Sequence, residues 1–156
     1  MGGEPKQFLM LGDRPLLAWS AGAAASSGVE MLIAGAHSDR MDDVRQVLDK
    51  WVEGVRLKTV EGGYERQETV RRCLAAVDEE FDLVVIHDAA RPFTSTELFV
   101  KTMQAAKRDG AATAAVRPWD TVKISRGDRT ETLSREKLWM VQTPQAFSTA
   151  LIKEAH

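Results

Sequence analysis

The segment VVIHDAARPFTS, residues 84–95, passes from a hydrophobic run directly into a charged turn that contains a proline. Asp88 and Arg91 stand three residues apart at the predicted end of a strand, where open α/β sheets bind ligands. Arginine suits bidentate contact with a phosphate or carboxylate. The alternative is that Asp88 and Arg91 only pair with each other. We favour ligand-facing roles for both and a structural role for His87.

Two glycine-containing segments could approach an anion. In GGEPKQF two glycines and a proline precede Lys6, whose ammonium could contact phosphate, although a flexible terminus with a solvated lysine is the simpler interpretation. In EGGYERQETV, residues 61–70, Gly62 and Gly63 allow close backbone approach, and Thr69 could hydrogen-bond a ligand or the backbone. Alternatively this is an ordinary strand-to-helix turn whose glycines supply positive φ angles. Neither segment has the spacing of a P-loop or a dinucleotide fingerprint.

Two later segments add weaker candidates. RPWDTVK and LSREKLWMVQTPQAF contain hydroxyl and basic side chains that could bind an anion: Thr121, Lys123, Arg135 and Thr143. These residues could equally be ordinary surface residues of an arm or of an edge strand.

The elements that must position these residues follow a regular alternation. Short apolar or β-branched runs predict strands, and amphipathic stretches between them predict helices. Such an alternation indicates βαβ units and an α/β fold with a mostly parallel sheet covered on both faces. The predicted strands are 29–35, 55–60, 82–88 and 111–118, and the predicted helices are 42–52, 67–81 and 95–110.

Residues 119–136 break this rhythm, because β-prone stretches flank the polar turn RGDR. The pattern predicts a protruding β-arm, which cannot bury much surface alone and is therefore expected to pack on another subunit. We expect one domain over residues 1–156. The chain opens in a loop and closes on the helix-like LIKEAH, which favours a longer protein around it.

Composition excludes several classes of partner. The net charge of -2 and the charged fraction of 28% predict no nucleic-acid partner, and no apolar run approaches the roughly 18 residues of a membrane span. The single cysteine, Cys73, excludes an internal disulfide and a four-cysteine metal site. With no recognisable leader, the sequence favours a cytoplasmic protein.

Five segments occur in a recognisable order: EPKQFLMLGDRPLL, EGGYERQETVRRCL, VVIHDAARPF, VRPWDTVK and LWMVQTPQAF. From about Gly3 onward the chain resembles the 2-C-methyl-D-erythritol 4-phosphate cytidylyltransferases of the non-mevalonate isoprenoid pathway. The resemblance implies a Rossmann-like, three-layer nucleotidyltransferase domain and a homodimer joined through the β-arm. It also implies transfer of CMP from CTP to methylerythritol phosphate, with release of pyrophosphate. A divalent cation, Mg²⁺, would be held mainly by the triphosphate, and no residue of this chain is assigned as a metal ligand.

The resemblance also implies roles at the nucleotide. Lys6 corresponds to the catalytic lysine that stabilises charge on the α-phosphate. Gly62, Gly63, Tyr64 and Thr69 occupy the positions around the cytosine.

On the acceptor side, Asp88 and Arg91 correspond to residues that contact the ribose and the methylerythritol phosphate. Thr121 and the second catalytic residue, Arg135, would reach the acceptor's phosphate from across the dimer, and Thr143 would lie beside the same pocket.

Departures from the family pattern are also visible. The family's first strand with its AAGxGxR loop, and a late segment with an acceptor-positioning lysine, are not in these residues, and some relatives carry a fused cyclodiphosphate synthase. Tyr64 fills a position that is often small or acidic, Thr69 replaces serine, and Cys73 replaces glycine. We expect a longer protein whose missing strand leaves apolar surface uncovered, the alternative being an inactive fragment.

Three other functions compete with this interpretation. A cytidylyltransferase for another polyol phosphate, such as ribitol 5-phosphate, shares much of the pattern. An inactive nucleotide-binding or dimer-forming module is the alternative from a different class. A nicotinamide-dependent dehydrogenase is weaker, because GxGxxG is absent.

Overall fold

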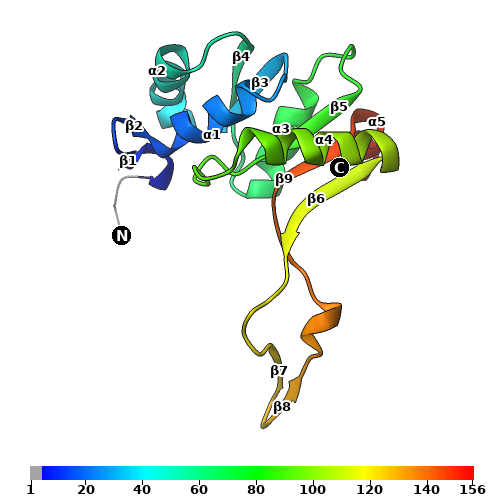
Figure 1. Ribbon diagram of the computed structural model, residues 1–156. Helices are drawn as coiled ribbons and strands as arrows, with labels where there is room; N and C mark the ends of the chain where they lie inside the picture. Colours follow the sequence, from blue (N-terminus) through cyan, green and yellow to red (C-terminus); the bar gives the residue numbers. More distant parts are fainter. Residues whose placement is uncertain (1–4) are drawn as a thin grey trace.

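The computed structural model describes residues 5–156, in which helices pack on short β-ladders and one thin arm projects from the body (Figure 1). The strands are β1 (Met10–Leu11), β2 (Arg14–Pro15), β3 (Met31–Ala36), β4 (Arg56–Glu61), β5 (Leu83–Ile86), β6 (Ala111–Val116), β7 (Lys123–Arg126), β8 (Arg129–Thr132) and β9 (Met140–Ser148). The helices are α1 (Leu16–Ala25), α2 (Met41–Trp51), α3 (Arg66–Ala75), α4 (Thr96–Asp109) and α5 (Thr149–Ala155). Short 3-10 turns cover Lys6–Phe8, Ser38–Arg40 and Arg135–Lys137.

The predicted strands and helices are all present, with shifted ends. The strand expected over 82–88 stops at Ile86, so His87 and Asp88 already belong to the loop that follows it. The helix expected over 67–81 ends at Ala75. No helix within residues 5–156 has the length and apolar character needed to cross a bilayer.

Strand directions are mixed. β3 and β4 pair in parallel, as the βαβ pattern predicts. β9 lies antiparallel between β5 and β6, which therefore share one direction with each other. The reason lies in the connection: the chain returns from β6 to β9 through a hairpin arm and not through a crossover helix, which permits antiparallel pairing.

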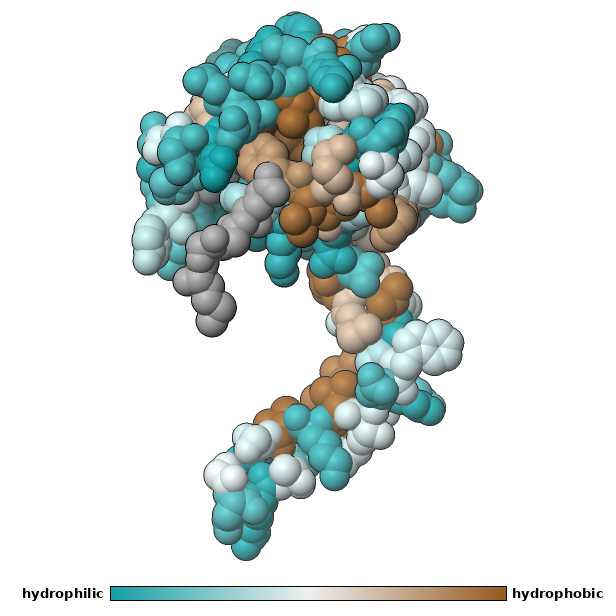
Figure 2. All heavy atoms as spheres, turned by 90° about the vertical axis from the view of Figure 1, so that its left-hand side faces the viewer, coloured by the Kyte–Doolittle hydropathy of each residue, from teal (hydrophilic) through white to brown (hydrophobic). Residues whose placement is uncertain are grey.

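The β3–β4 ladder and the β5–β9–β6 ladder do not join within the described part of the chain. Between β3 and β5 lies a cavity of about 780 Å³, also lined by α1 and α3, and its lining includes Leu32, Ala34, Cys73, Val84 and Ile86. Figure 2 shows hydrophobic surface in a hollow of the body. The backbone edges of β3 and β5 away from their partner strands therefore have no strand partner in residues 5–156.

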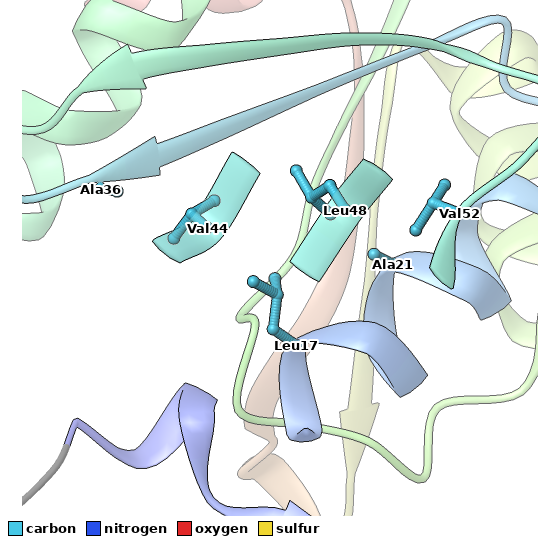
Figure 3. Packing of buried hydrophobic residues seen from close by; sticks show 6 residues of the cluster. All are labelled: Leu17, Ala21, Ala36, Val44, Leu48 and Val52. Atoms are coloured by element: carbon cyan, nitrogen blue, oxygen red, sulfur yellow. The ribbon is translucent and has the colours of Figure 1, made fainter. Parts of the chain in front are cut away.

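The core between α1, α2 and β3 explains why these helices form here. In α2, Val44 and Leu48 lie four residues apart on one face and are 3% and 0% exposed. They meet Leu17 and Ala21 of α1, with Ala36 and Val52 completing the cluster (Figure 3). On the other ladder, α4 packs across β6 and β9 and buries Phe99 almost completely. Helix α1 joins the two packed groups, because it contacts α2 and β3 on one side and α4 on the other.

The arm begins where β6 and β9 leave the body and ends in the β7–β8 hairpin (Figure 1). Gly127, in the turn, has a φ of 69°, a conformation that glycine adopts without strain. At the base of the arm, Arg117 donates to the carbonyls of Glu136 and Leu138 and lies 3.7 Å from the ring centre of Trp139. These contacts tie the two sides of the arm together.

Candidate active site

Asp88, in the loop after β5, is the centre of the polar cluster at this end of the sheet. Arg66 donates from Nε and Nη2 to Oδ1 of Asp88 at 3.1 and 2.9 Å, and Arg91 donates from Nε to Oδ2 at 3.0 Å. The backbone N–H of Asp88 donates to Oγ1 of Thr143 at 3.2 Å. The pairing of Asp88 with Arg91 is therefore present, but neither Nη of Arg91 has a hydrogen bond within residues 5–156. That guanidinium can still bind an anion.

The carboxyl of Asp88 is held in its charged form. Partial burial raises the pKa of Asp88, but the hydrogen bonds from Arg66 and Arg91 outweigh it, so that the pKa lies below its usual value. Near neutral pH, Asp88 is consequently a hydrogen-bond acceptor and not a proton donor.

His87 faces inward. Its ring meets the ring of Phe99 edge-on, with centroids 4.9 Å apart and an interplanar angle of 66°. Nε2 lies 3.4 Å from the backbone oxygen of Arg91, and the buried Nδ1 has no partner in the described part of the chain. Burial lowers the pKa of His87, which favours the neutral ring. This packing agrees with a structural role.

The turn between β4 and α3 is fixed by the hydroxyl of Thr69. It accepts from the backbone N–H of Gly63 at 2.9 Å and donates to the carbonyl of Glu65 at 3.2 Å. Gly62 and Gly63 do not have positive φ angles, so the alternative explanation of these glycines by backbone conformation is wrong. The reason for Gly62 is space, because a Cβ there would lie 2.9 Å from Oγ1 of Thr69. The side chain of Tyr64 is fully exposed at the tip of this turn.

Lys6 begins the first 3-10 turn, and its side chain has no hydrogen bond or ion pair in residues 5–156. Its backbone carbonyl accepts from Leu9 at 3.1 Å, and the carbonyl of Leu9 accepts from Leu16 at 3.0 Å. The next residue, Gln7, lines the same cavity as Asp88. The ammonium of Lys6 is therefore held on an ordered turn and is available to a ligand. The two glycines of GGEPKQF lie outside the described residues.

The arm residues lie apart from this cluster. Thr121 and Arg135 are exposed, and Arg135 donates from Nη1 to the carbonyl of Trp119 at 2.9 Å. The arm extends away from the body (Figure 1), so one chain does not bring Thr121 or Arg135 to Asp88. Thr143, in contrast, lies within β9 and is only 5% exposed.

One site residue was missed by sequence reasoning. Arg66 opens α3 directly after the glycine turn, and its position in EGGYER was the available signal. What could not be read was its partner, because Asp88 lies 22 residues further along the chain.

No group of three or more histidine, cysteine or acidic side chains within residues 5–156 is arranged to hold a metal ion. Asp88 alone, already engaged by two arginines, does not make a protein cage for a cation. The described residues do not fit a cation held by protein ligands, and we derive no step through such an ion.

An α/β domain with basic and acidic side chains gathered where the strands end is typical of enzymes that bind nucleotides and phosphates. The profile of the family described as "IspD: 2-C-methyl-D-erythritol 4-phosphate cytidylyltransferase" matches residues 1–156. The chain therefore belongs to this family of nucleotidyltransferases, which confirms the resemblance seen in the sequence.

Individual relatives agree with the family assignment. A protein of Syntrophus aciditrophicus named 2-C-methyl-D-erythritol 4-phosphate cytidylyltransferase is 39% identical over 158 residues, covering 98% of this chain and 67% of the relative. The crystal structure of the 4-diphosphocytidyl-2C-methyl-D-erythritol synthase of Anaerococcus prevotii aligns with a TM-score of 0.88 at 30% identity, covering 95% of this chain and 68% of that one. The bifunctional IspDF of Campylobacter jejuni aligns with a TM-score of 0.75 at 28% identity, covering 96% of this chain and 37% of that one. The predicted nucleotidyltransferase fold is thereby confirmed.

Proposed function

We propose that this protein transfers CMP from CTP to 2-C-methyl-D-erythritol 4-phosphate, giving 4-diphosphocytidyl-2-C-methyl-D-erythritol and pyrophosphate. The observation that carries the proposal is the family match over residues 1–156. The polar cluster around Asp88 supports this proposal, because the cluster lies at the end of the sheet, where a nucleotide and a second phosphate can both bind.

The reaction needs little proton chemistry. A phosphate oxygen of the acceptor forms a bond to the α-phosphorus of CTP. The bond from that phosphorus to the oxygen between the α- and β-phosphates breaks, and pyrophosphate leaves with the electron pair. The nucleophile is already an anion, so catalysis consists of positioning and of neutralising negative charge in the transition state. Lys6 is the candidate for neutralising that negative charge, because its exposed ammonium has no partner within residues 5–156.

The nucleotide side is the turn before α3. The hydroxyl of Thr69 holds the N–H of Gly63, and the N–H of Gly62 bonds to the carbonyl of Ala36. We therefore assign the recognition of cytosine to the backbone carbonyls of Gly62 and Gly63, which can accept from its amino group. Tyr64 offers an exposed ring beside them. Asp88, as an ionised acceptor, suits the hydroxyls of the ribose.

The acceptor side combines two subunits. Arg91 and Thr143 belong to the body, whereas Thr121 and Arg135 belong to an arm that would reach the site of a partner in a homodimer. The arm supports this by its exposed apolar side chains, since Trp119 is 87% exposed and Val141 58%. Figure 2 shows several hydrophobic patches along the arm. A subunit packed there would cover them.

We propose that the cavity between β3 and β5 receives one further strand. Both bordering strands have an unpaired edge, and the lining is mainly apolar, as a buried central strand requires. The loop that follows such a strand would emerge at the edge of the sheet occupied by Asp88, where it could bind the triphosphate together with a divalent cation, Mg²⁺, whose ligands would then come mainly from CTP.

The test is pyrophosphate release by the full-length protein incubated with CTP, Mg²⁺ and methylerythritol phosphate, with ribitol 5-phosphate as a parallel acceptor. We expect release with methylerythritol phosphate and a far smaller rate with ribitol 5-phosphate. Background release with both acceptors would overturn the proposal. Calorimetric binding of CTP without turnover would then indicate a nucleotide-binding module.

A further inference from the structure

We propose that Arg66 is a positioning residue of this site: it holds one oxygen of the Asp88 carboxylate while Arg91 holds the other, and so fixes the carboxylate between the nucleotide and acceptor sides. This inference rests on the function proposed above. It concerns a residue to which neither the motifs nor the relatives' names assign a role.

The geometry is that of a clamp. Two N–H donors of Arg66 converge on Oδ1 at 3.1 and 2.9 Å, and Nε of Arg91 reaches Oδ2 at 3.0 Å. A carboxylate has about four lone-pair sites, of which these three donors take three. About one acceptor position then remains on Oδ2, which limits the direction from which a ligand hydroxyl can approach.

The backbone beneath the carboxylate is fixed as well. The N–H of Asp88 is bonded to Thr143 at 3.2 Å, so a contact from β9 holds the main chain while the two arginines hold the side chain. The first turn of α3, the loop after β5 and the middle of β9 therefore meet at Asp88. Without Arg66, the one side-chain donor left to the Asp88 carboxylate within residues 5–156 would be Arg91, which lies on its own loop.

Arg66 also connects the two halves of the site. It lies three residues before Thr69, one helical turn away, and Thr69 holds the glycine turn assigned to cytosine. The other end of the Arg66 side chain contacts the loop of Arg91, assigned to the acceptor. As a surface ion pair this contact would add little stability, because Arg66 is 59% exposed. The contact instead orients the Asp88 carboxylate, so its loss should lower kcat/KM for both substrates.

The experiment compares Arg66→Ala and Arg66→Lys in the full-length protein. We expect Arg66→Ala to lower kcat/KM for both substrates by about 10- to 100-fold, the effect of losing hydrogen bonds to a charged group. Arg66→Lys should restore part of the loss, because an ammonium can bond Oδ1 but not with a rigid fork. The matched control is Arg71→Ala, an exposed arginine on the same helix whose side chain has no hydrogen bond to any of residues 5–156, which should stay within about twofold of wild type. Wild-type kcat/KM in Arg66→Ala would overturn the proposal.

If Arg66 acts through Asp88, two further results are expected. In an Asp88→Asn background, Arg66→Ala should lower kcat/KM by less than about a further twofold. If the losses of the two single variants instead multiply, the inference is contradicted. Among the described residues, the charged or titratable side chains that contact or adjoin Asp88 are Arg66, Arg91 and His87. Losing Arg66 should raise the pKa of Asp88 and so move the acidic limb of the pH profile to higher pH. An unmoved limb would count against it.

One readout separates this inference from the proposed function. If the wild type shows no turnover with either acceptor, the proposed function fails. The carboxyl carbon of Asp88 can still be titrated by NMR in wild type and in Arg66→Ala. A higher pKa of Asp88 in the variant supports the clamp, and an unchanged pKa overturns it.

Discussion

The backbone amide of Asp88 and the hydroxyl of Thr143 are joined by a hydrogen bond of 3.2 Å, across 55 residues of sequence. Thr143 is buried in β9, whereas Asp88 opens the loop after β5. The loop that carries Asp88 is thus attached to β9, the strand through which the chain returns from the arm into the body. Its position depends on β9 being paired correctly with β5, where Ile86 faces Gln145 in register.

Lys6→Ala should slow pyrophosphate release by about 100-fold or more, the usual effect of removing one group that stabilises transition-state charge. The thermal midpoint should not change, because the side chain is exposed and unpaired within residues 5–156. Steady-state kinetics and a melting curve measure the two effects. Lys101→Ala, at an exposed lysine of α4 that pairs with Glu97, is the control. Wild-type turnover in Lys6→Ala would remove Lys6 from the mechanism.

Asp88→Asn should destabilise the fold only above a certain pH. The folded-state pKa of Asp88 is lowered below the unfolded value of about 4, so its stabilising effect is fully present above pH 4 and is lost as the pH falls through the folded-state pKa. Urea unfolding should therefore separate wild type from Asp88→Asn at pH 7, and the difference should shrink as the pH is lowered through the folded-state pKa. A difference that stays constant as the pH is lowered would show that charge is not the reason.

Gly35→Ala should destabilise the protein by about 1–3 kcal/mol, the cost of overpacking. A Cβ at this position would overlap with the Cγ2 methyl of Thr69 and lie 3.0 Å from Sγ of Cys73. Thr69→Ser removes that methyl but keeps the hydroxyl that holds Gly63, so the double variant should recover much of the loss. Chemical denaturation of the single and double variants measures the coupling, and simple additivity would argue against this contact.

Arg14→Ala should loosen the segment that carries Lys6. The guanidinium of Arg14 lies 4.3 Å from the ring centre of Trp19 and 4.7 Å from that of Trp51, so it stacks with two aromatic rings. We expect a loss of about 1 kcal/mol and faster hydrogen exchange at the amide of Leu16, which bonds to Leu9. Arg108→Ala, at an exposed arginine that pairs with its neighbour Asp109, serves as the control. Equal effects of the two substitutions would contradict the stacking argument.

Mixed dimers should reveal whether the arm serves the partner. Lys6→Ala and Arg135→Ala are expected to be nearly inactive alone. A dimer containing one of each has one site with both residues intact if Arg135 reaches across. Random mixing in equal amounts should therefore restore about a quarter of wild-type activity after subunit exchange. No recovery in a mixture shown to contain mixed dimers would place Arg135 in its own chain's site.

Local pattern was enough for much of this protein. Asp88 and Arg91 are close in sequence, so their shared loop could be predicted from the strand before them and the proline after them. The amphipathic spacing of Val44 and Leu48 likewise defined α2 and its buried face. Features that depend on distant partners could not be read in this way. The direction of β9 depends on how the chain returns from the arm, and the contact of Arg66 with Asp88 depends on how α3 is placed beside β5.

β9 is one continuous strand that starts among the exposed residues at the base of the arm, at Met140, and ends deep in the body at Ser148. Thr143 lies between these ends. The register of β9 against β6 shifts between Gln145 and Val141, around Thr143, so the same strand carries both the irregularity at the root of the arm and the residue that holds the backbone of Asp88. Thermodynamic linkage is reciprocal. If a partner subunit binds the arm and thereby fixes the loop of Asp88, a ligand that fixes this loop would in turn strengthen the binding of the partner.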